Sequence, residues 1–191
     1  MSEKIKVAVL VSGGGTNLQA LIDKEADGQI PDAHIVKVIA SREDAFALER
    51  AAKAGIETAV AKEPQQVMEE LQKSGADMIV LAGYMKVLPK EIIERYRNKI
   101  INIHPSLIPK YCGKGFYGKR VHKAVLEGGE KESGATVHFV DEGMDSGPIL
   151  LQKAVEVKPG DTPELLQRRV MEEAEWVILP RAIDMIANGQ I

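Results

Sequence analysis

The sequence predicts an α/β fold, a single domain built on a doubly wound and mostly parallel sheet. Apolar, β-branched segments alternate with amphipathic helical segments through the first half of the chain, which is the pattern of βαβ units. Several strands read as almost continuous apolar runs, as strands do when helices cover both faces of a parallel sheet. The 191 residues are 45% hydrophobic and 28% charged, a composition that suits one core in a single domain over residues 1–191.

The first half of the chain is expected to supply the parallel strands and the helices between them. A β-branched strand ends in a run of glycines, and helical apolar spacing follows it. Gly55 and Gly75 stand where helix C-termini favour a left-handed residue, and Pro89 suits the first turn of a helix. The expected strands are 4–11, 34–41, 57–61, 77–82 and 99–103, and the expected helices are 16–26, 44–54, 64–74 and 89–96.

The alternation stops after residue 103. A helix is expected over 121–127, followed by two strands over 134–140 and 149–157. Only a short loop joins these strands, so they are expected to be antiparallel, because parallel pairs need a long crossover. A long C-terminal helical segment over 161–187 completes the chain, with a kink or break expected at Pro180.

The strand over 99–103 leads into the residues best suited to chemistry. Asn102 and His104 are two residues apart and share one face of a strand, which Pro105 then ends. The pair is therefore expected at the carboxyl edge of the sheet, where open α/β sheets bind ligands. An amide and an imidazole can stabilise an oxyanion, and the carboxylate of Asp145 can orient the imidazole and relay a proton. His138 is expected to neighbour this site.

A glycine-rich turn, Gly13-Gly14-Gly15-Thr16-Asn17-Leu18, joins the first strand to the first helix. Glycines let the backbone approach a ligand, and a helix N-terminus favours an anion, so phosphate binding is expected here. Thr16 or Asn17 can instead cap the helix. The turn lacks the lysine of a Walker A loop, and Leu18 replaces the third glycine of a dinucleotide fingerprint.

Composition excludes several other classes of function. A net charge of −3 argues against a nucleic-acid partner, and the longest early apolar run is too short for a signal peptide or a membrane span. The single cysteine, Cys112, rules out an internal disulfide and suits a reducing, cytoplasmic setting; no nucleophile motif surrounds it. The 4 histidines lack metal-ligand spacing, so no metal is expected.

These motifs together resemble the folate-dependent formyltransferases, and within them the branch that acts in purine biosynthesis. The resemblance covers nearly the whole chain, and its markers are Ser12–Ala20, Leu81–Met85, Asn102–Pro109 and Gly134–Ile149. The His-Pro-Ser-Leu stretch with a downstream aspartate is typical of the wider family. The glycine-rich first turn followed by Thr-Asn-Leu is typical of the purine branch. The resemblance implies a Rossmann-like fold with a phosphate-binding N-terminal half and a folate-binding, catalytic C-terminal half.

The resemblance also implies a reaction, in which 10-formyltetrahydrofolate donates its formyl group to the amine of N1-(5-phospho-D-ribosyl)glycinamide (glycinamide ribonucleotide) on the way to IMP. It implies catalysis by Asn102, His104 and Asp145, with no metal. The residues it implies for the ribonucleotide are Gly13, Gly14, Gly15, Thr16, Asn17, Leu18 and Glu175. Those it implies for folate are Met85, Lys86, Val87, Leu88, Asn102 and Val140, with Lys62 where the family often has an arginine. The segment Cys112–Gly118 departs from the family's Pro-Gly form.

Several alternatives stay open at this point. One is a formyltetrahydrofolate hydrolase, and another is a formyltransferase for a different amine, on tRNA or on a sugar nucleotide. Relatives that deformylate folate or act on tRNA usually carry an extra domain, for which 191 residues leave no room. A non-catalytic folate- or nucleotide-binding module on the same fold is the third. The expected partners are small-molecule substrates, and the protein is expected to be a monomer or homodimer.

Overall fold

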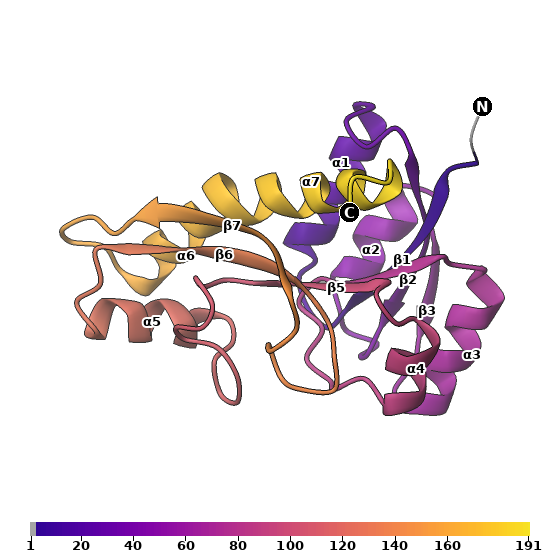
Figure 1. The fold of residues 1–191 in the computed structure, drawn as a ribbon, viewed down its shortest axis with the longest axis horizontal. Helices are drawn as coiled ribbons and strands as arrows, with labels where there is room; N and C mark the ends of the chain where they lie inside the picture. Colours follow the sequence, from indigo (N-terminus) through magenta and orange to yellow (C-terminus); the bar gives the residue numbers. More distant parts are fainter. Residues whose placement is uncertain (1–2) are drawn as a thin grey trace.

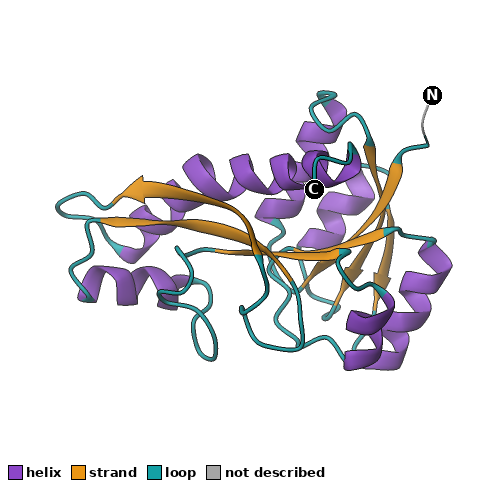
Figure 2. Ribbon diagram, viewed as in Figure 1, coloured by secondary structure: helices purple, strands orange, loops and turns teal. Residues whose placement is uncertain are grey.

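The computed structural model describes residues 3–191, and its centre is a seven-stranded sheet of order β3-β2-β1-β4-β5-β6-β7 (Figures 1 and 2). The first five strands along the chain pair in parallel, and β6 and β7 add to one edge in antiparallel fashion. This arrangement confirms the predicted fold class. The strands are β1 (Ile5–Val11), β2 (Ala33–Ala40), β3 (Glu57–Val60), β4 (Met78–Leu81), β5 (Ile100–His104), β6 (Glu132–Phe139) and β7 (Ile149–Glu156).

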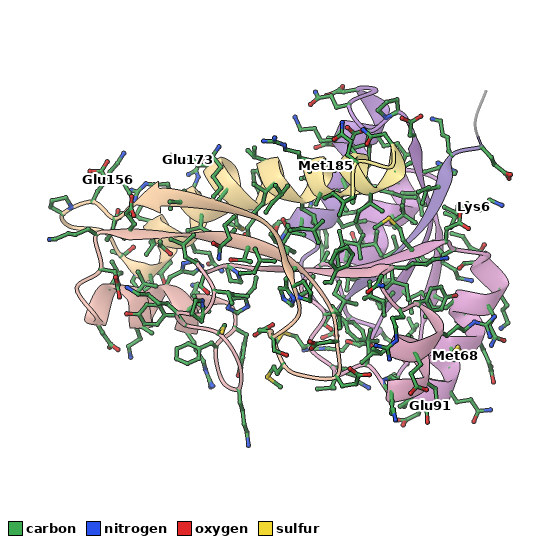
Figure 3. The ribbon with its side chains drawn as sticks, in the orientation of Figure 1. Lys6, Met68, Glu91, Glu156, Glu173 and Met185 are labelled. Atoms are coloured by element: carbon green, nitrogen blue, oxygen red, sulfur yellow. The ribbon has the colours of Figure 1, made fainter. Side chains whose placement is uncertain are left out.

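Helices cover both faces of the sheet and enclose two cores. Side chains of α1, α2, α5, α6 and α7 pack on one face, and side chains of α3 and α4 pack on the other. Figure 3 shows side chains filling the space between the sheet and the helices, whereas Glu91 and Glu173 project outward. The helices are α1 (Thr16–Ala26), α2 (Ala47–Lys53), α3 (Pro64–Ser74), α4 (Lys90–Arg95), α5 (Lys119–Glu127), α6 (Pro163–Val170), η1 (Met171–Glu175) and α7 (Trp176–Ala187). Within residues 3–191, none of these helices has the length and apolar character needed to cross a bilayer.

The strand order reverses between β1 and β4. From β1 the chain builds toward β2 and β3 on one side, and from β4 it builds toward β5, β6 and β7 on the other. Crossovers leave such a switch point in opposite directions, which opens a crevice at the carboxyl ends of its two strands. The loops after β1, β4 and β5 therefore lie at one edge of the sheet, and the loop after the antiparallel strand β6 lines the same cavity (Figure 2).

The C-terminal helical segment differs from the prediction at Pro180. A kink or break was predicted there, and the break is wrong, because α7 continues through Pro180. The irregular stretch lies earlier, in the single π-helical turn η1 between α6 and α7. Wide turns of this kind occur often at functional sites, since they re-aim the side chains at their ends. Here Met171 and Glu175, at the two ends of η1, both line the same cavity.

A buried cation lies in the middle of β2, where the sequence pattern indicates an apolar side chain. Lys37 is 2% exposed, and its ammonium lies 2.7 Å from Glu57 Oε1 and 2.6 Å from Glu70 Oε2. These carboxylates, on β3 and α3, compensate a charge that would otherwise be costly to bury. Lys37 therefore ties the edge strand β3 and helix α3 to the sheet.

Candidate active site

A cavity of about 490 Å³ opens at the carboxyl edge of the sheet, at the switch point. It brings together three segments that are far apart in the chain: the end of β5, the loop between β6 and β7, and the first turn of α1. Asn102, His104 and Asp145, which were predicted together from the sequence, all line it. Its wall also includes Thr16, Asn17, Met85, Lys86, Val87, Leu88, Gly113, Lys114, His138, Val140, Met171 and Glu175.

His104 is the last residue of β5 and is 5% exposed. Its Nε2 lies 2.9 Å from the main-chain carbonyl oxygen of Tyr111. A carbonyl can only accept, so Nε2 carries the proton and donates it to Tyr111. Its Nδ1 then faces Asp145 Oδ2 at 3.8 Å. Burial lowers the pKa of His104 below its ordinary value, although the Tyr111 carbonyl and the Asp145 carboxylate oppose this effect.

Asn102 is oriented by a second histidine. His138 on β6 is 2% exposed and pairs with Asn102 in the antiparallel register. His138 Nδ1 donates to the carbonyl of Phe139 at 2.8 Å, so that Nε2 is an acceptor whenever it carries no proton. Asn102 Nδ2 lies 3.1 Å from that Nε2. One N–H of Asn102 is thereby fixed, and its other N–H is available for a ligand.

Asp145 occupies a left-handed backbone conformation, with φ 53°, in the loop between β6 and β7. Its Oδ2 accepts a hydrogen bond from the Gly113 amide at 2.8 Å, and its Oδ1 lies 3.6 Å from His138 Nε2. Burial alone acts to raise the pKa of this carboxyl, but His138, the Gly113 amide and His104 outweigh burial. The pKa therefore lies below its ordinary value, and Asp145 is a carboxylate at neutral pH.

Gly15 and Arg50 determine the conformation of the glycine-rich turn at the N-terminus of α1. Gly15 is the N-cap, with φ 73°, and a Cβ there would lie 2.6 Å from Ala47 Cβ, so both conformation and space require glycine. Arg50 braces the turn from α2, because its Nε donates to the Gly14 carbonyl at 2.7 Å. Within the described chain no side chain caps α1, so the capping alternative for Thr16 and Asn17 is wrong. Leu18 is fully buried in the core, so only its main chain can meet a ligand.

Glu175 lies against this turn from η1. It is 6% exposed, and its Oε1 accepts a hydrogen bond from Asn17 Nδ2 at 3.4 Å. Burial raises the pKa of Glu175 to about 7, which the bond from Asn17 only partly offsets. Asn17 Oδ1 is buried and has no hydrogen-bond partner within residues 3–191. Asn17 and Glu175 thus line the cavity with part of their hydrogen-bonding capacity unused, which is typical of groups that bind a polar ligand.

Replacing Glu175 by Gln is expected to stabilise the ligand-free protein above neutral pH. The folded pKa of about 7 exceeds the ordinary value of 4.5, so the folded state loses stability as pH rises between these values. The full difference corresponds to roughly 3 kcal/mol. Urea unfolding of both proteins should therefore show Glu175→Gln gaining stability over the wild type at about pH 8, with little gain at about pH 5. A gain independent of pH would contradict the raised pKa.

The loop after β4 forms the apolar wall of the cavity. Met85 and Val87 are exposed, and Leu88 is buried. The Met85 amide donates to Ser12 Oγ at 2.9 Å, which ties this loop to the end of β1. Lys86 Nζ donates to the Lys62 carbonyl, whereas the Lys62 ammonium pairs with Glu43 at 2.5 Å. Lys62 thus stands outside the residues that line the cavity.

Sequence reasoning underrated two features of this cavity. His138 contacts both Asn102 and Asp145, and its i+2 relation to Val140, the residue after β6, was the available signal. The segment Cys112–Gly118 supplies the Gly113 amide to Asp145 and places Lys114 on the rim. Of the nearby basic residues, Lys119 and Lys123 pair with Glu164 and Glu127, as solvated helix residues commonly do. Within residues 3–191, no group of three His, Cys, Asp or Glu side chains is arranged to hold a metal.

Comparison with known proteins identifies relatives of this chain. It is 42% identical over 195 residues to phosphoribosylglycinamide formyltransferase of Haemophilus influenzae, covering 97% of this chain and 89% of that protein. It is also 42% identical over 194 residues to the trifunctional purine biosynthetic protein adenosine-3 of Drosophila melanogaster; this match covers 96% of the chain but only 14% of that longer protein. The crystal structure of glycinamide ribonucleotide transformylase 1 from Symbiobacterium toebii superposes with a TM-score of 0.92 at 40% identity, covering 99% of this chain and 90% of that one. A family model described as formyl transferase matches residues 5–183, and the chain therefore belongs to the formyl transferase family.

Proposed function

We propose that the protein transfers a formyl group from 10-formyltetrahydrofolate to the amine of glycinamide ribonucleotide, as a phosphoribosylglycinamide formyltransferase of purine biosynthesis. The observation that carries this proposal is the joint placement of Asn102, His104 and Asp145 on one cavity beside the glycine-rich turn. The names of the bacterial relative and of the Symbiobacterium structure support the same reaction. A binding module has no need for this set of groups.

The two substrates would enter from opposite sides of the cavity. On one side, the glycine-rich turn and the N-terminus of α1 suit the phosphate of the ribonucleotide, with Asn17 and Glu175 beside it. On the other side, the wall from Met85 to Leu88 together with Val140 offers an apolar surface and main-chain groups for the pterin. Asn102, His104 and Asp145 line the same cavity, and in this proposal the amine and the formyl carbon meet beside them.

The amine nitrogen attacks the formyl carbon, and the carbonyl oxygen becomes an oxyanion. The free N–H of Asn102 can donate to this oxygen. His104 can donate from Nδ1 once that nitrogen is protonated, and both the oxyanion and Asp145 favour that protonation. Donors held in place before the charge develops stabilise the transition state without reorganisation.

Proton transfer completes the reaction. Attack leaves an extra proton on the amine nitrogen, and the carboxylate of Asp145 takes it, directly or through water. As the tetrahedral intermediate collapses, the bond from carbon to the folate nitrogen breaks, and Asp145 passes the proton it took to that nitrogen, directly or through water. The products are the formylated ribonucleotide and tetrahydrofolate, and no covalent bond to the protein forms. Cys112, whose pKa burial raises, has no role in this scheme.

A formyl-transfer assay tests the proposal. Purified protein is mixed with 10-formyltetrahydrofolate, with and without glycinamide ribonucleotide, and both tetrahydrofolate and formylated product are followed. We expect equal amounts of the two products, and only when the ribonucleotide is present. Release of tetrahydrofolate into water alone would instead identify a hydrolase. No turnover in either mixture would favour another acceptor amine or a binding module.

A further inference from the structure

We propose that Glu130 is a positioning residue that acts through Tyr111 on the orientation and tautomer of His104. The inference rests on the proposed function, since it concerns a histidine assigned to that reaction. Glu130 touches neither the cavity that holds Asn102 and Asp145 nor any group placed on the substrates. It lies behind the segment 106–111, which follows β5 and returns over His104.

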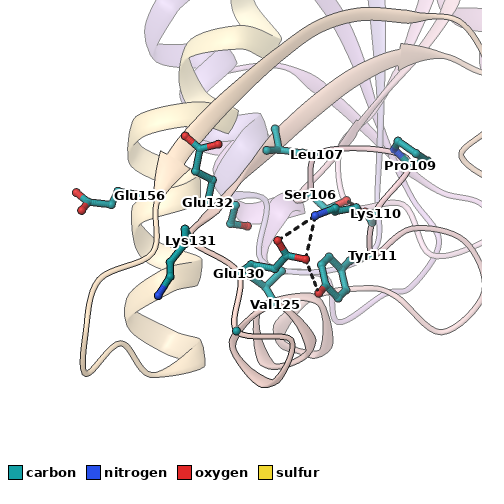
Figure 4. Close-up of a pocket in the computed structure, with 12 residues that line it drawn as sticks. Ser106, Leu107, Pro109, Lys110, Tyr111, Val125, Glu130, Lys131, Glu132 and Glu156 are labelled. Carbon is teal, nitrogen blue, oxygen red and sulfur yellow. Dashed lines mark hydrogen bonds and ion pairs between the residues drawn. The ribbon is translucent and has the colours of Figure 1, made fainter.

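Glu130 lines a second cavity, of about 740 Å³, together with Ser106 to Leu107 and Pro109 to Tyr111 of that segment (Figure 4). Its carboxylate accepts hydrogen bonds from Lys110 Nζ, at 3.0 Å to each oxygen, and from the Tyr111 hydroxyl at 3.0 Å. The dashed lines in Figure 4 trace this three-residue cluster. Lys110 and Tyr111, two consecutive residues of the segment, thus both donate hydrogen bonds to the Glu130 carboxylate.

Tyr111 connects this cluster to the candidate active site. Its phenol faces Glu130, and its main-chain carbonyl accepts the proton of His104 Nε2 at 2.9 Å. Its backbone has φ 51°, a conformation that costs free energy in a residue with a bulky side chain and that persists only where neighbours impose it. Phe116 packs edge-on against the Tyr111 ring, and Ser106 Oγ donates to the Lys110 carbonyl at 2.6 Å.

Gly128 gives independent support for the importance of the phenol position. It follows α5 with φ −74°, an ordinary conformation, so its backbone does not require glycine. A Cβ at this position would lie 2.2 Å from the Tyr111 hydroxyl oxygen. The next nearest atoms, Ala124 O and Tyr111 Cζ, would lie at 3.3 and 3.4 Å. Space for the Tyr111 hydroxyl is therefore what this glycine provides.

The Tyr111 carbonyl determines which nitrogen of His104 holds the proton. With the carbonyl in place, Nε2 is protonated and Nδ1 faces Asp145. The other titratable groups near His104 are His138 from β6 and His122 from α5, and burial lowers the pKa of His122 to about 4, so it stays neutral. If the carbonyl moves, Nε2 loses its acceptor and the ring turns or changes tautomer. Donation from Nδ1 to the oxyanion then weakens.

The test is a double-mutant cycle on the contact between Gly128 and Tyr111. Gly128→Ala should push the phenol away and lower kcat by about tenfold, because small displacements of reacting groups are costly. Tyr111→Phe should lower kcat by roughly threefold, through loss of one hydrogen bond. The double variant should lose no more than Tyr111→Phe alone, since the 2.2 Å contact involves only the hydroxyl. Glu127→Gln, on the same helix and paired with Lys123, is the matched control and should retain full kcat.

A readout on His104 itself separates positioning from stability. In ¹⁵N NMR spectra the wild type should show the Nε2–H tautomer of His104. Gly128→Ala and Glu130→Ala should shift its tautomer and its pKa, whereas Glu130→Gln, which keeps an acceptor for Tyr111, should restore the wild-type signals. This readout needs no turnover, so it decides the inference even if the proposed reaction is wrong. Unchanged His104 signals in Glu130→Ala and Tyr111→Phe, or additive losses of kcat in the cycle, would overturn it.

Discussion

His104→Ala is expected to lower kcat for formyl transfer about 10²–10³-fold, a loss of roughly 2.7–4 kcal/mol of transition-state stabilisation. The imidazole is buried between the Tyr111 carbonyl and Asp145, and in the proposed mechanism it donates to an oxyanion that exists only during reaction. An interaction made only in the transition state changes kcat and leaves KM nearly constant. Steady-state kinetics with both substrates varied measure the two constants separately.

Asn102→Ala should have a similar effect, because in the proposed mechanism Asn102 provides the second donor to the same oxygen. The matched control for the histidine variant is His34→Ala, which removes an exposed histidine that pairs with Glu25 near the start of β2 and is not among the residues that line the cavity. His34→Ala should keep wild-type kcat. If His104→Ala also kept it while remaining folded, His104 would have no part in stabilising the oxyanion.

Asp145→Asn is expected to lower kcat about 10²–10⁴-fold, the usual range for loss of a general acid or base. The substitution keeps the size of the side chain and an oxygen that can accept from the Gly113 amide. It removes the negative charge beside His104 and the ability to accept a proton from the amine. The loss should therefore appear in kcat with little change in thermal unfolding.

The control for Asp145 is Glu142→Gln in the same loop, since Glu142 is exposed and pairs with Arg97. Its kcat should match the wild type. In the proposed mechanism Asp145 and His104 act on one intermediate, so the double variant should lose much less than the product of the two single losses. Multiplicative losses would mean that the two residues act independently, against the proposed relay.

The sequence predicted the fold well because its elements are locally encoded. The apolar runs of β1 and β4, and the glycines and prolines at helix ends, are signals within a few residues of the feature they predict. Pro180 shows the limit of such signals: packing of α7 against the sheet keeps the helix continuous where local propensity favours a break. Lys37 shows a second limit of local signals, because its partners Glu57 and Glu70 lie on other elements that are distant in the sequence.

The candidate site also contains residues that the sequence could predict and residues that it could not. Asn102 and His104 could be predicted as a pair, because a spacing of two in a strand fixes a common face. Asp145 stood out through its glycine-bracketed loop and through the family resemblance. The contacts of His138 with Asn102 depend on the antiparallel register of β5 and β6, which sequence patterns do not specify. The chain of contacts from Glu130 through Tyr111 to His104 depends on how a loop folds back, and no local signal encodes it.

The central claim is direct transfer between two substrates bound together in one cavity. A rapid-quench single turnover tests it most directly, with donor labelled in the formyl group and enzyme in excess. We predict that label passes from donor to ribonucleotide with no labelled protein at any time, and that none leaves the donor until the ribonucleotide is added. Label that accumulates on the protein before product forms would contradict the account.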